Sequence, residues 1–143
     1  MIQPTEKPRV VAVIEDSEVW QNIYRNLHDA RTEIHVFGTH PEAAEWLASH
    51  KADMVISDNR IAGQSFTGCE WVQQFREDDT HTPVIVASTH MGGVEKARAL
   101  AAGAQDIISK MDSTSATLRA LIDEWAGKDV ALQQGVSKGG ISR

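Results

Sequence analysis

The sequence predicts an α/β fold in which a doubly wound, five-stranded parallel sheet lies between layers of helices. Short apolar runs alternate with five segments of helical periodicity along the chain. The connections between them are short, as is usual for repeated strand–helix units. At 143 residues the chain is long enough for one compact domain and not for two. Segment lengths do not by themselves determine the strand order.

The expected strands are apolar runs bounded by turn residues or charges. The run that starts at Pro83 is acceptable as a strand because proline is tolerated at a first position. The five expected strands are Arg9–Ile14, Glu33–Phe37, Met54–Ser57, Pro83–Ala87 and Asp106–Ser109.

The first three helices are predicted from capping signals and apolar spacing. Ser17 is the expected N-cap of the first helix. Residues 39–42, Thr-His-Pro-Glu, read as a capping box with proline in the first turn of the second helix. The third helix follows a long loop, residues 59–67, and carries Trp71, Val72 and Phe75.

The last two helices are predicted from apolar residues at helical spacing. The fourth spans 93–102 and stops at Gly103. Its expected inward stripe consists of Val94, Ala97, Leu100 and Ala101. The fifth starts near Asp112 or Ser113 and has an apolar stripe made of Leu118, Leu121, Ile122 and Trp125.

Composition limits the class of protein. The net charge is −6 and no Lys/Arg cluster offers a phosphate footprint, which argues against direct nucleic-acid binding. The single cysteine, Cys69, precludes an internal disulfide and fits a reducing compartment. No stretch approaches the ~18 apolar residues of a membrane span. We therefore expect a cytoplasmic protein with no membrane partner. Along the chain we expect an N-terminal extension (1–8), one domain (9–126) and a flexible tail (127–143).

Polar side chains stand where the expected strands end. These residues are Glu15, Asp16, Asp58, Ser88 and Lys110. Because the carboxyl ends of parallel strands meet at one sheet edge, we expect them to converge. Two like charges ~4 Å apart cost roughly 4 kcal/mol at an effective dielectric of about 20. A divalent cation relieves that repulsion, and an all-oxygen site suits Mg²⁺.

These residues resemble the response-regulator receiver domain of two-component signalling, over about Arg9 to Trp125. The resemblance rests on five motifs in order: Val-Ile-Glu-Asp (13–16), Ile-Ser-Asp (56–58), Val-Ala-Ser-Thr (86–89), Ala-Gly-Ala (102–104) and Ser-Lys (109–110). It implies strand order 2-1-3-4-5 in a flavodoxin-like three-layer sandwich, like the chemotaxis member of the family. In that order Glu15 and Asp16 lie beside Asp58.

The resemblance also implies a metal site. Asp16 and Asp58 would bind Mg²⁺ directly, and Glu15 would act through water. The backbone carbonyl of Arg60 occupies the position of the third protein ligand.

The same resemblance implies that Asp58 is the phosphoacceptor of a phosphorelay, forming an aspartyl phosphate by self-catalysed transfer. Ser88 would bond one phosphoryl oxygen, and Lys110 would pair with Asp58 and then with the phosphoryl group. The donor would be a partner histidine kinase, a phosphotransfer protein or a small acyl phosphate. The phosphoprotein would then switch its surface around the fourth helix, fifth strand and fifth helix. An unnamed downstream protein is the expected target, and the chain would be a monomer or a phosphorylation-dependent dimer.

The chain departs from the family pattern at several positions. Ile107 replaces the usual aromatic switch residue, so an aromatic flip coupled to Ser88 is not available. Met111 replaces a common proline, which precludes a cis Lys–Pro bond. Arg60, Thr89 and His90 hold positions that modulate the lifetime of the phosphorylated state in this family.

Two rival functions remain open. One is a phosphorylation-independent protein-binding module of the same fold, which the departures at Ile107 and Met111 favour and the intact acid set opposes. The other is a small phosphotransferase or phosphatase with an aspartate nucleophile, which needs a substrate cap that no insertion here is large enough to form. The absence of a Gly-rich turn after the first strand disfavours a nucleotide-binding enzyme.

Overall fold

The structure is a computed structural model and describes residues 7–89 and 92–131. Its centre is a five-stranded parallel sheet of order β2-β1-β3-β4-β5, which confirms the order that the family resemblance implies. The strands are β1 (Arg9–Ile14), β2 (Thr32–Phe37), β3 (Met54–Asp58), β4 (Val84–Ser88) and β5 (Asp106–Ser109). They alternate with α1 (Glu18–Arg25), α2 (His40–Leu47), α3 (Gly68–Phe75), α4 (Gly93–Ala102) and α5 (Ser115–Trp125).

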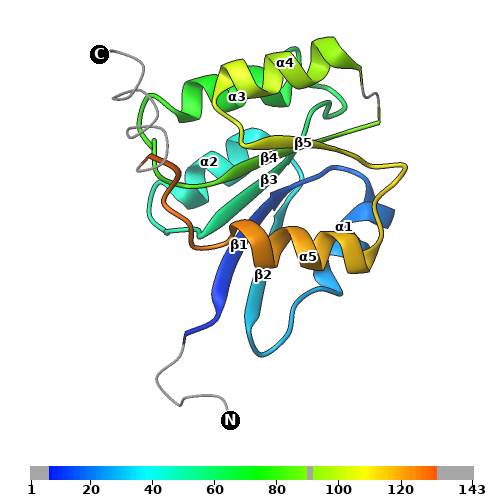
Figure 1. Ribbon diagram of the computed structural model, residues 1–143, viewed down its shortest axis with the longest axis vertical. Helices are drawn as coiled ribbons and strands as arrows, with labels where there is room; N and C mark the ends of the chain where they lie inside the picture. Colours follow the sequence, from blue (N-terminus) through cyan, green and yellow to red (C-terminus); the bar gives the residue numbers. More distant parts are fainter. Residues whose placement is uncertain (1–6, 90–91, 132–143) are drawn as a thin grey trace.

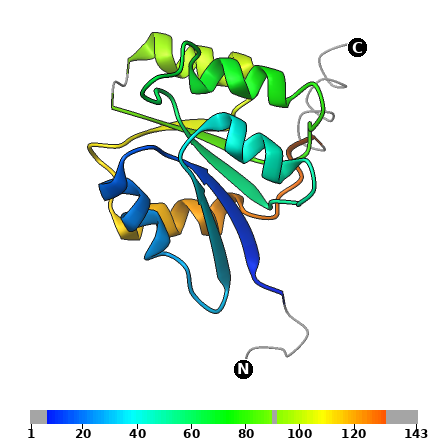
Figure 2. The ribbon, with the colours of Figure 1, turned by 180° about the vertical axis from the view of Figure 1, so that it is seen from behind.

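The helices cover both faces of the sheet. Figures 1 and 2 show α1 and α5 on one side, and α2, α3 and α4 on the other. Successive side chains of a strand point to opposite faces, so each strand contributes to two cores. In β1, Val11 and Val13 pack with the α1–α5 layer, whereas Ala12 and Ile14 pack with the α2–α4 layer. Because the middle of β1, β3 and β4 is buried on both faces, each of these strands contains an uninterrupted apolar run.

The helix starts follow the predicted caps only in part. Ser17 stands at the N-cap of α1, but its side chain makes no capping hydrogen bond among the described residues. Thr39 accepts the backbone N–H of Glu42, which is one half of the predicted box. The reciprocal boxes lie at Thr67–Glu70 before α3 and at Thr114 before α5, so α5 begins slightly later than predicted.

The predicted inward stripe of α4 is wrong. Val94 and Leu100 are 58% and 46% exposed, and Ala97 and Ala101 are also exposed, while Ala99 is fully buried. The helix packs against β5 and α3 at the sheet edge. A helix rich in alanine has weak amphipathicity, so apolar spacing alone does not specify which side faces inward.

Packing continues past the predicted domain boundary at residue 126. Gly127 donates its backbone N–H to the Asp53 carbonyl at 3.1 Å. Val130 is only 1% exposed and donates its N–H to the carbonyl of His81, also at 3.1 Å. The chain therefore packs against the domain as far as Val130, within the segment that the sequence predicts as a flexible tail. Within the described ranges, no helix is both long and apolar enough to cross a membrane.

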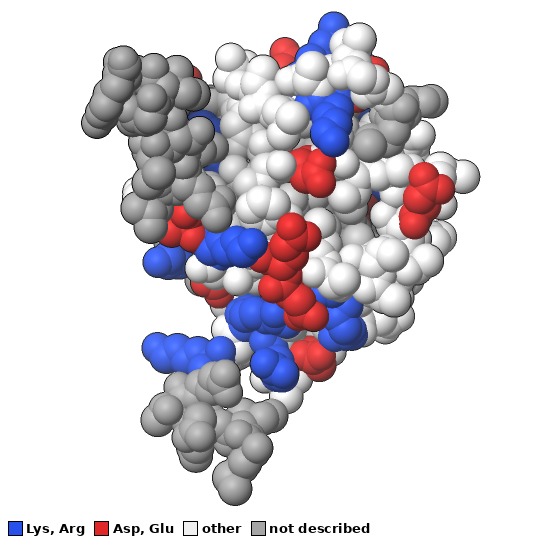
Figure 3. All heavy atoms as spheres, viewed as in Figure 1, with Lys and Arg blue, Asp and Glu red and all other residues white. Residues whose placement is uncertain are grey.

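Charges of both signs alternate on the face seen in Figure 3. Two ion pairs join α5 to other parts of the chain: Arg9 with Asp123, and Arg119 with Asp29, each at 2.7 Å. Exposed pairs of this kind contribute little to stability, typically about 0–1 kcal/mol. On this face, acidic side chains lie between basic ones, so that the basic side chains do not form one continuous patch.

Candidate functional site

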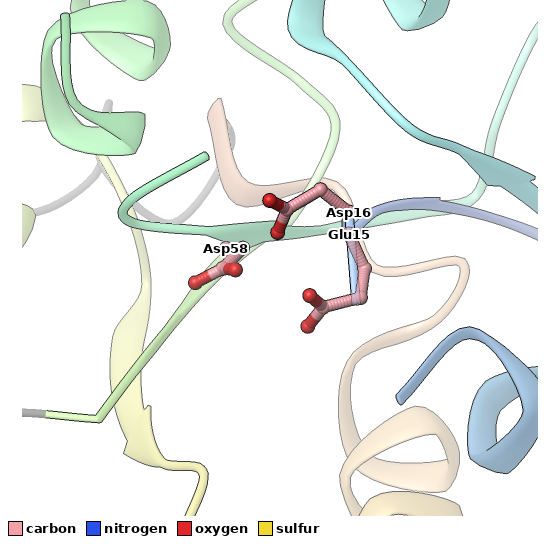
Figure 4. Close-up of side chains that lie close together, drawn as sticks. All are labelled: Glu15, Asp16 and Asp58. Carbon is pink, nitrogen blue, oxygen red and sulfur yellow. The ribbon is translucent and has the colours of Figure 1, made fainter. Parts of the chain in front are cut away.

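Three carboxylates meet at the carboxyl ends of β1 and β3. Glu15 and Asp16 directly follow β1, and Asp58 is the last residue of β3. The two strands are neighbours in parallel register, with Ile14 opposite Ser57, so the residues just beyond each are brought together. Carboxylate oxygens of the three acids lie within 4.8 Å of one another (Figure 4). The sequence prediction that these acids converge is confirmed.

Lys110 brings an ammonium group into the same cluster. Its Nζ lies 2.7 Å from Glu15 Oε1 and donates to Asp58 Oδ2 at 3.3 Å. The residue is only 6% exposed. The ring of Trp20, on α1, lies 5.3 Å from Nζ and adds a cation–π contact that the sequence did not reveal. Lys110 is therefore held from three sides.

Ser88 reaches this edge through the pairing of β4 with β5. Ser88 lies opposite Ser109, and its carbonyl accepts the backbone N–H of Lys110 at 2.9 Å. The hydroxyl-bearing residue and the lysine are thus fixed to each other through the sheet itself. Ser88 is buried, at 5% exposure.

Burial dominates the electrostatics of the cluster. It raises the pKa of Glu15 to about 7, opposed by the contact with Lys110 and reinforced by the charge of Asp58. Burial also acts to lower the pKa of Lys110, but Glu15 and Asp58 outweigh it, so that this pKa is raised. Lys110 therefore stays positively charged at neutral pH. The carboxyl group of Glu15, in contrast, has a pKa close to neutral pH.

The donor set fits a hard divalent cation. Glu15 Oε1 is buried and, although close to Lys110, has no hydrogen bond of suitable geometry among the described residues. Three acids opposite one ammonium leave an excess of negative charge, and every available ligand atom is oxygen. These are the properties of a site for Mg²⁺.

A cavity of about 270 Å³ lies over Asp58. Its walls come from the ends of β1, β3, β4 and β5, the start of the 59–67 loop and α4. It is lined by Asp16, Asp58, Asn59, Arg60, Ser88, Thr89, Glu95 and Lys110. Glu95 was not among the predicted site residues, because only the placement of α4 brings it to the opening.

The remaining predicted positions have different surroundings. Arg60 and Thr89 are exposed at the rim of the cavity. His90 lies outside the described residues. Ile107 is 3% exposed and belongs to the core of the α2–α4 layer, while Met111 is 78% exposed. The position of the usual aromatic switch is thus filled by a packed aliphatic side chain.

The loop after Asp58 is fixed by contacts that sequence reasoning missed. Asn59 accepts two backbone N–H groups from the start of α3: its carbonyl accepts Gly68 at 2.7 Å, and its side chain accepts Cys69 at 3.2 Å. Further along, Ala62 donates its N–H to Asp16 Oδ2 at 3.0 Å. These partners are distant in sequence, so no local signal marks them.

A family model for the response regulator receiver domain matches residues 11–123. The chain therefore belongs to this family of two-component signalling domains. A comparison with curated proteins found no significant match.

Solved structures agree with this assignment at the level of the fold. The chemotaxis response regulator CheY4 of Vibrio cholerae has a TM-score of 0.74 at 22% identity, covering 82% of this chain and 98% of that chain. The orphan response regulator HP1043 of H. pylori has a TM-score of 0.72 at 21% identity, covering 83% and 97%. The BeF3-activated DrrB receiver domain has a TM-score of 0.72 at 17% identity, covering 82% and 97%.

Proposed function

We propose that Asp58 accepts a phosphoryl group from a partner histidine kinase or phosphotransfer protein in a Mg²⁺-dependent reaction. The observation that supports this most is the buried Lys110 ammonium between Glu15 and Asp58, at the edge where three acids meet. An exposed acid cluster without this ammonium would have many explanations. The combination has the charges that phosphoryl transfer to a carboxylate requires.

The chemistry follows from the positions of the side chains. A carboxylate oxygen of Asp58 attacks phosphorus, the bond from phosphorus to the donor breaks, and its electron pair leaves with the donor nitrogen or oxygen. Negative charge gathers on the equatorial oxygens of the phosphoryl group. Lys110 and Ser88 neutralise and bind those oxygens from the ends of β5 and β4.

Mg²⁺ would be held by Asp16, Asp58 and the Arg60 carbonyl, with Glu15 reached through water. When bound, it supplies positive charge to the same phosphoryl oxygens. Arg60 and Thr89, at the cavity rim, stand where they can limit the approach of water and so set the lifetime of the aspartyl phosphate; His90 is proposed for the same role from its family position. The new charge would draw Ser88 toward it and change the α4–β5–α5 surface that a downstream protein contacts.

The packed Ile107 limits how this signal travels. Because an aliphatic side chain in the core cannot repeat the rotation of an aromatic ring, we propose that the connection between Ser88 and α4 carries the change. The aliphatic residue at position 107 also favours the rival function, a binding module that does not use phosphorylation. The experiment must therefore distinguish the two functions.

The test is the intact mass of the protein after incubation with acetyl phosphate and Mg²⁺. We expect one phosphoryl adduct on the parent and none on Asp58→Asn or in a Mg²⁺-free control. Asp112→Asn, which changes an exposed acid after β5, is the matched control and should be modified like the parent. No adduct on the parent, with no effect of beryllofluoride on its NMR spectrum, would favour the phosphorylation-independent module.

A further inference from the structure

His40 is a buried titratable residue that phosphoryl transfer does not use. It is the first residue of α2 and is 0% exposed. Its ring lies between two aromatic side chains, with centroids 5.4 Å from Phe66 and 5.2 Å from Trp71. A polar ring in such a position is costly unless both of its nitrogens have partners.

Both nitrogens of the His40 ring do have partners, and the direction of each hydrogen bond can be assigned. The backbone N–H of His40 donates to Gln64 Oε1 at 3.0 Å, which leaves the Gln64 amide nitrogen as the donor to His40 Nδ1 at 2.7 Å. Nδ1 is then the acceptor, so Nε2 carries the proton and donates to Ser57 Oγ at 2.8 Å. Ser57 in turn donates to the carbonyl of Asp58 at 3.0 Å.

This chain of bonds ends on the phosphoacceptor and on its loop. Ser57 directly precedes Asp58, and its hydroxyl holds the Asp58 carbonyl. Gln64 belongs to the 59–67 loop, which also carries the Arg60 carbonyl. The same loop is held on its other side by the bond from Ala62 to Asp16. Besides the contacts of Asn59 with α3, the loop is therefore held by a carboxylate of the acid cluster and by His40.

We propose that His40 is a positioning residue that holds the 59–67 loop and the Asp58 backbone in the geometry that binds Mg²⁺, acting through Gln64 and Ser57. This inference rests on the proposed function of the site. A residue that orients metal ligands typically changes metal affinity by about 10–100-fold when it is removed. Such a role differs from packing alone, which would change stability and leave the affinity of the folded protein intact.

Two single variants and their combination test the proposal. Gln64→Ala removes the loop side of the network at a half-buried position, and His40→Phe keeps an aromatic ring while removing both ring nitrogens. Gln74→Ala, which changes an exposed glutamine of α3, is the matched control. The readouts are the Mg²⁺ dissociation constant by calorimetry, the rate of phosphorylation by acetyl phosphate, and the unfolding midpoint in urea.

We expect Mg²⁺ to bind about 10-fold more weakly to Gln64→Ala and at least as weakly to His40→Phe. Adding Gln64→Ala to His40→Phe should cause a smaller loss than Gln64→Ala causes in the parent, because the ring bond to Gln64 is already gone and only the bond from the backbone N–H of residue 40 is left to lose. Gln74→Ala should bind Mg²⁺ like the parent. In the parent, the His40 Nε2–H should give a slowly exchanging imidazole proton signal in the NMR spectrum, which Gln64→Ala shifts.

Unchanged Mg²⁺ affinity and phosphorylation rate in Gln64→Ala would overturn the proposal, even if His40→Phe does not fold. Independent losses that multiply in the double variant would also overturn it. If the parent itself neither binds Mg²⁺ nor takes up a phosphoryl group, the proposed function fails together with this inference. If the parent does both and the variants match it, only the role of His40 fails.

Discussion

The residue His40 shows how burial of a titratable side chain makes the stability of the protein depend on pH. Burial lowers its pKa to about 4, partly opposed by the hydrogen bond from Gln64. In the unfolded chain the pKa is near 6.5. The unfolded state therefore binds a proton more readily, and the stability that neutral His40 contributes is present above pH ~6.5 and is lost as the pH falls toward 4.

We expect the parent to lose up to roughly 3 kcal/mol more stability than His40→Phe between pH 7 and pH 4. The phenylalanine variant lacks this titrating group but keeps the acidic residues that titrate in the same range. Urea unfolding of both proteins at several pH values measures the difference. Parallel stability curves for the two proteins would show that His40 is not held neutral.

Gly68 lies so close to the backbone of Asp58 that only glycine fits at this position. A Cβ at this position would lie 2.5 Å from the Asp58 carbonyl oxygen and 3.0 Å from Ser57 Oγ. The start of α3 can pack against Asp58 only because Gly68 has no Cβ atom. At Gly93, the first residue of α4, a Cβ would meet nothing within 4 Å.

Gly68→Ala should therefore destabilise the protein by about 1–3 kcal/mol, as overpacking does elsewhere. It should also lower the phosphorylation rate, because the Asp58 backbone must move. Gly93→Ala, the matched control, should be neutral or stabilising by about 0.4–1 kcal/mol. Thermal unfolding and the mass-shift assay measure both effects; equal behaviour of the two variants would contradict the close approach.

At the scale of the element, α4 is the helix whose orientation the apolar pattern did not reveal. Its only fully buried residue is Ala99, and its larger apolar side chains, Val94 and Leu100, face outward. Against β5 and α3, small residues allow a close packing that larger ones would prevent. The side chains of Val94 and Leu100 are therefore exposed to solvent.

The orientation of α4 predicts opposite effects for the same substitution at two positions. Ala99→Leu should destabilise the protein by about 1–3 kcal/mol, because the buried site has no room for the added atoms. Ala101→Leu, at an exposed position of the same helix, should stay within about 0.5 kcal/mol of the parent. Urea unfolding distinguishes them, and a larger loss for Ala101→Leu would mean that α4 is rotated.

For the molecule as a whole, the proposed Mg²⁺ site would link folding to metal binding. Glu15 and Asp16 are neighbours in the sequence, but Asp58 is distant from them and joins them only in the folded state. A cation that binds this site therefore binds the native state and not the unfolded one. The cluster also makes the metal-free protein less stable than its packing alone would allow, because like charges are held together.

Mg²⁺ should raise the stability of the parent by about 2.7 kcal/mol when its concentration is 100 times the dissociation constant. The increase should be much smaller for Asp16→Asn, which removes one of the proposed ligands. NaCl at equal ionic strength is the control for screening. An unfolding midpoint that responds to NaCl and to MgCl₂ alike would exclude specific binding.

Prediction from the sequence worked best where the signal is local and repeated. Apolar runs and helical periodicity marked all five strands and all five helices. The polar ends of the strands marked Asp58 and Lys110, because any residue that follows a parallel strand is delivered to the same edge. The family motifs then supplied the strand order, which segment lengths had left open.

Periodicity and strand direction were thus enough to predict the fold class, the order of the elements and the residues gathered at the carboxyl edge. Three features became clear only from the three-dimensional packing: which side of α4 is buried, how the 59–67 loop is anchored on His40, and that Val130 packs beside His81. Each of these depends on a contact between residues far apart in the chain. Such contacts are selected by the shape of the assembled core, which no local pattern of side chains encodes.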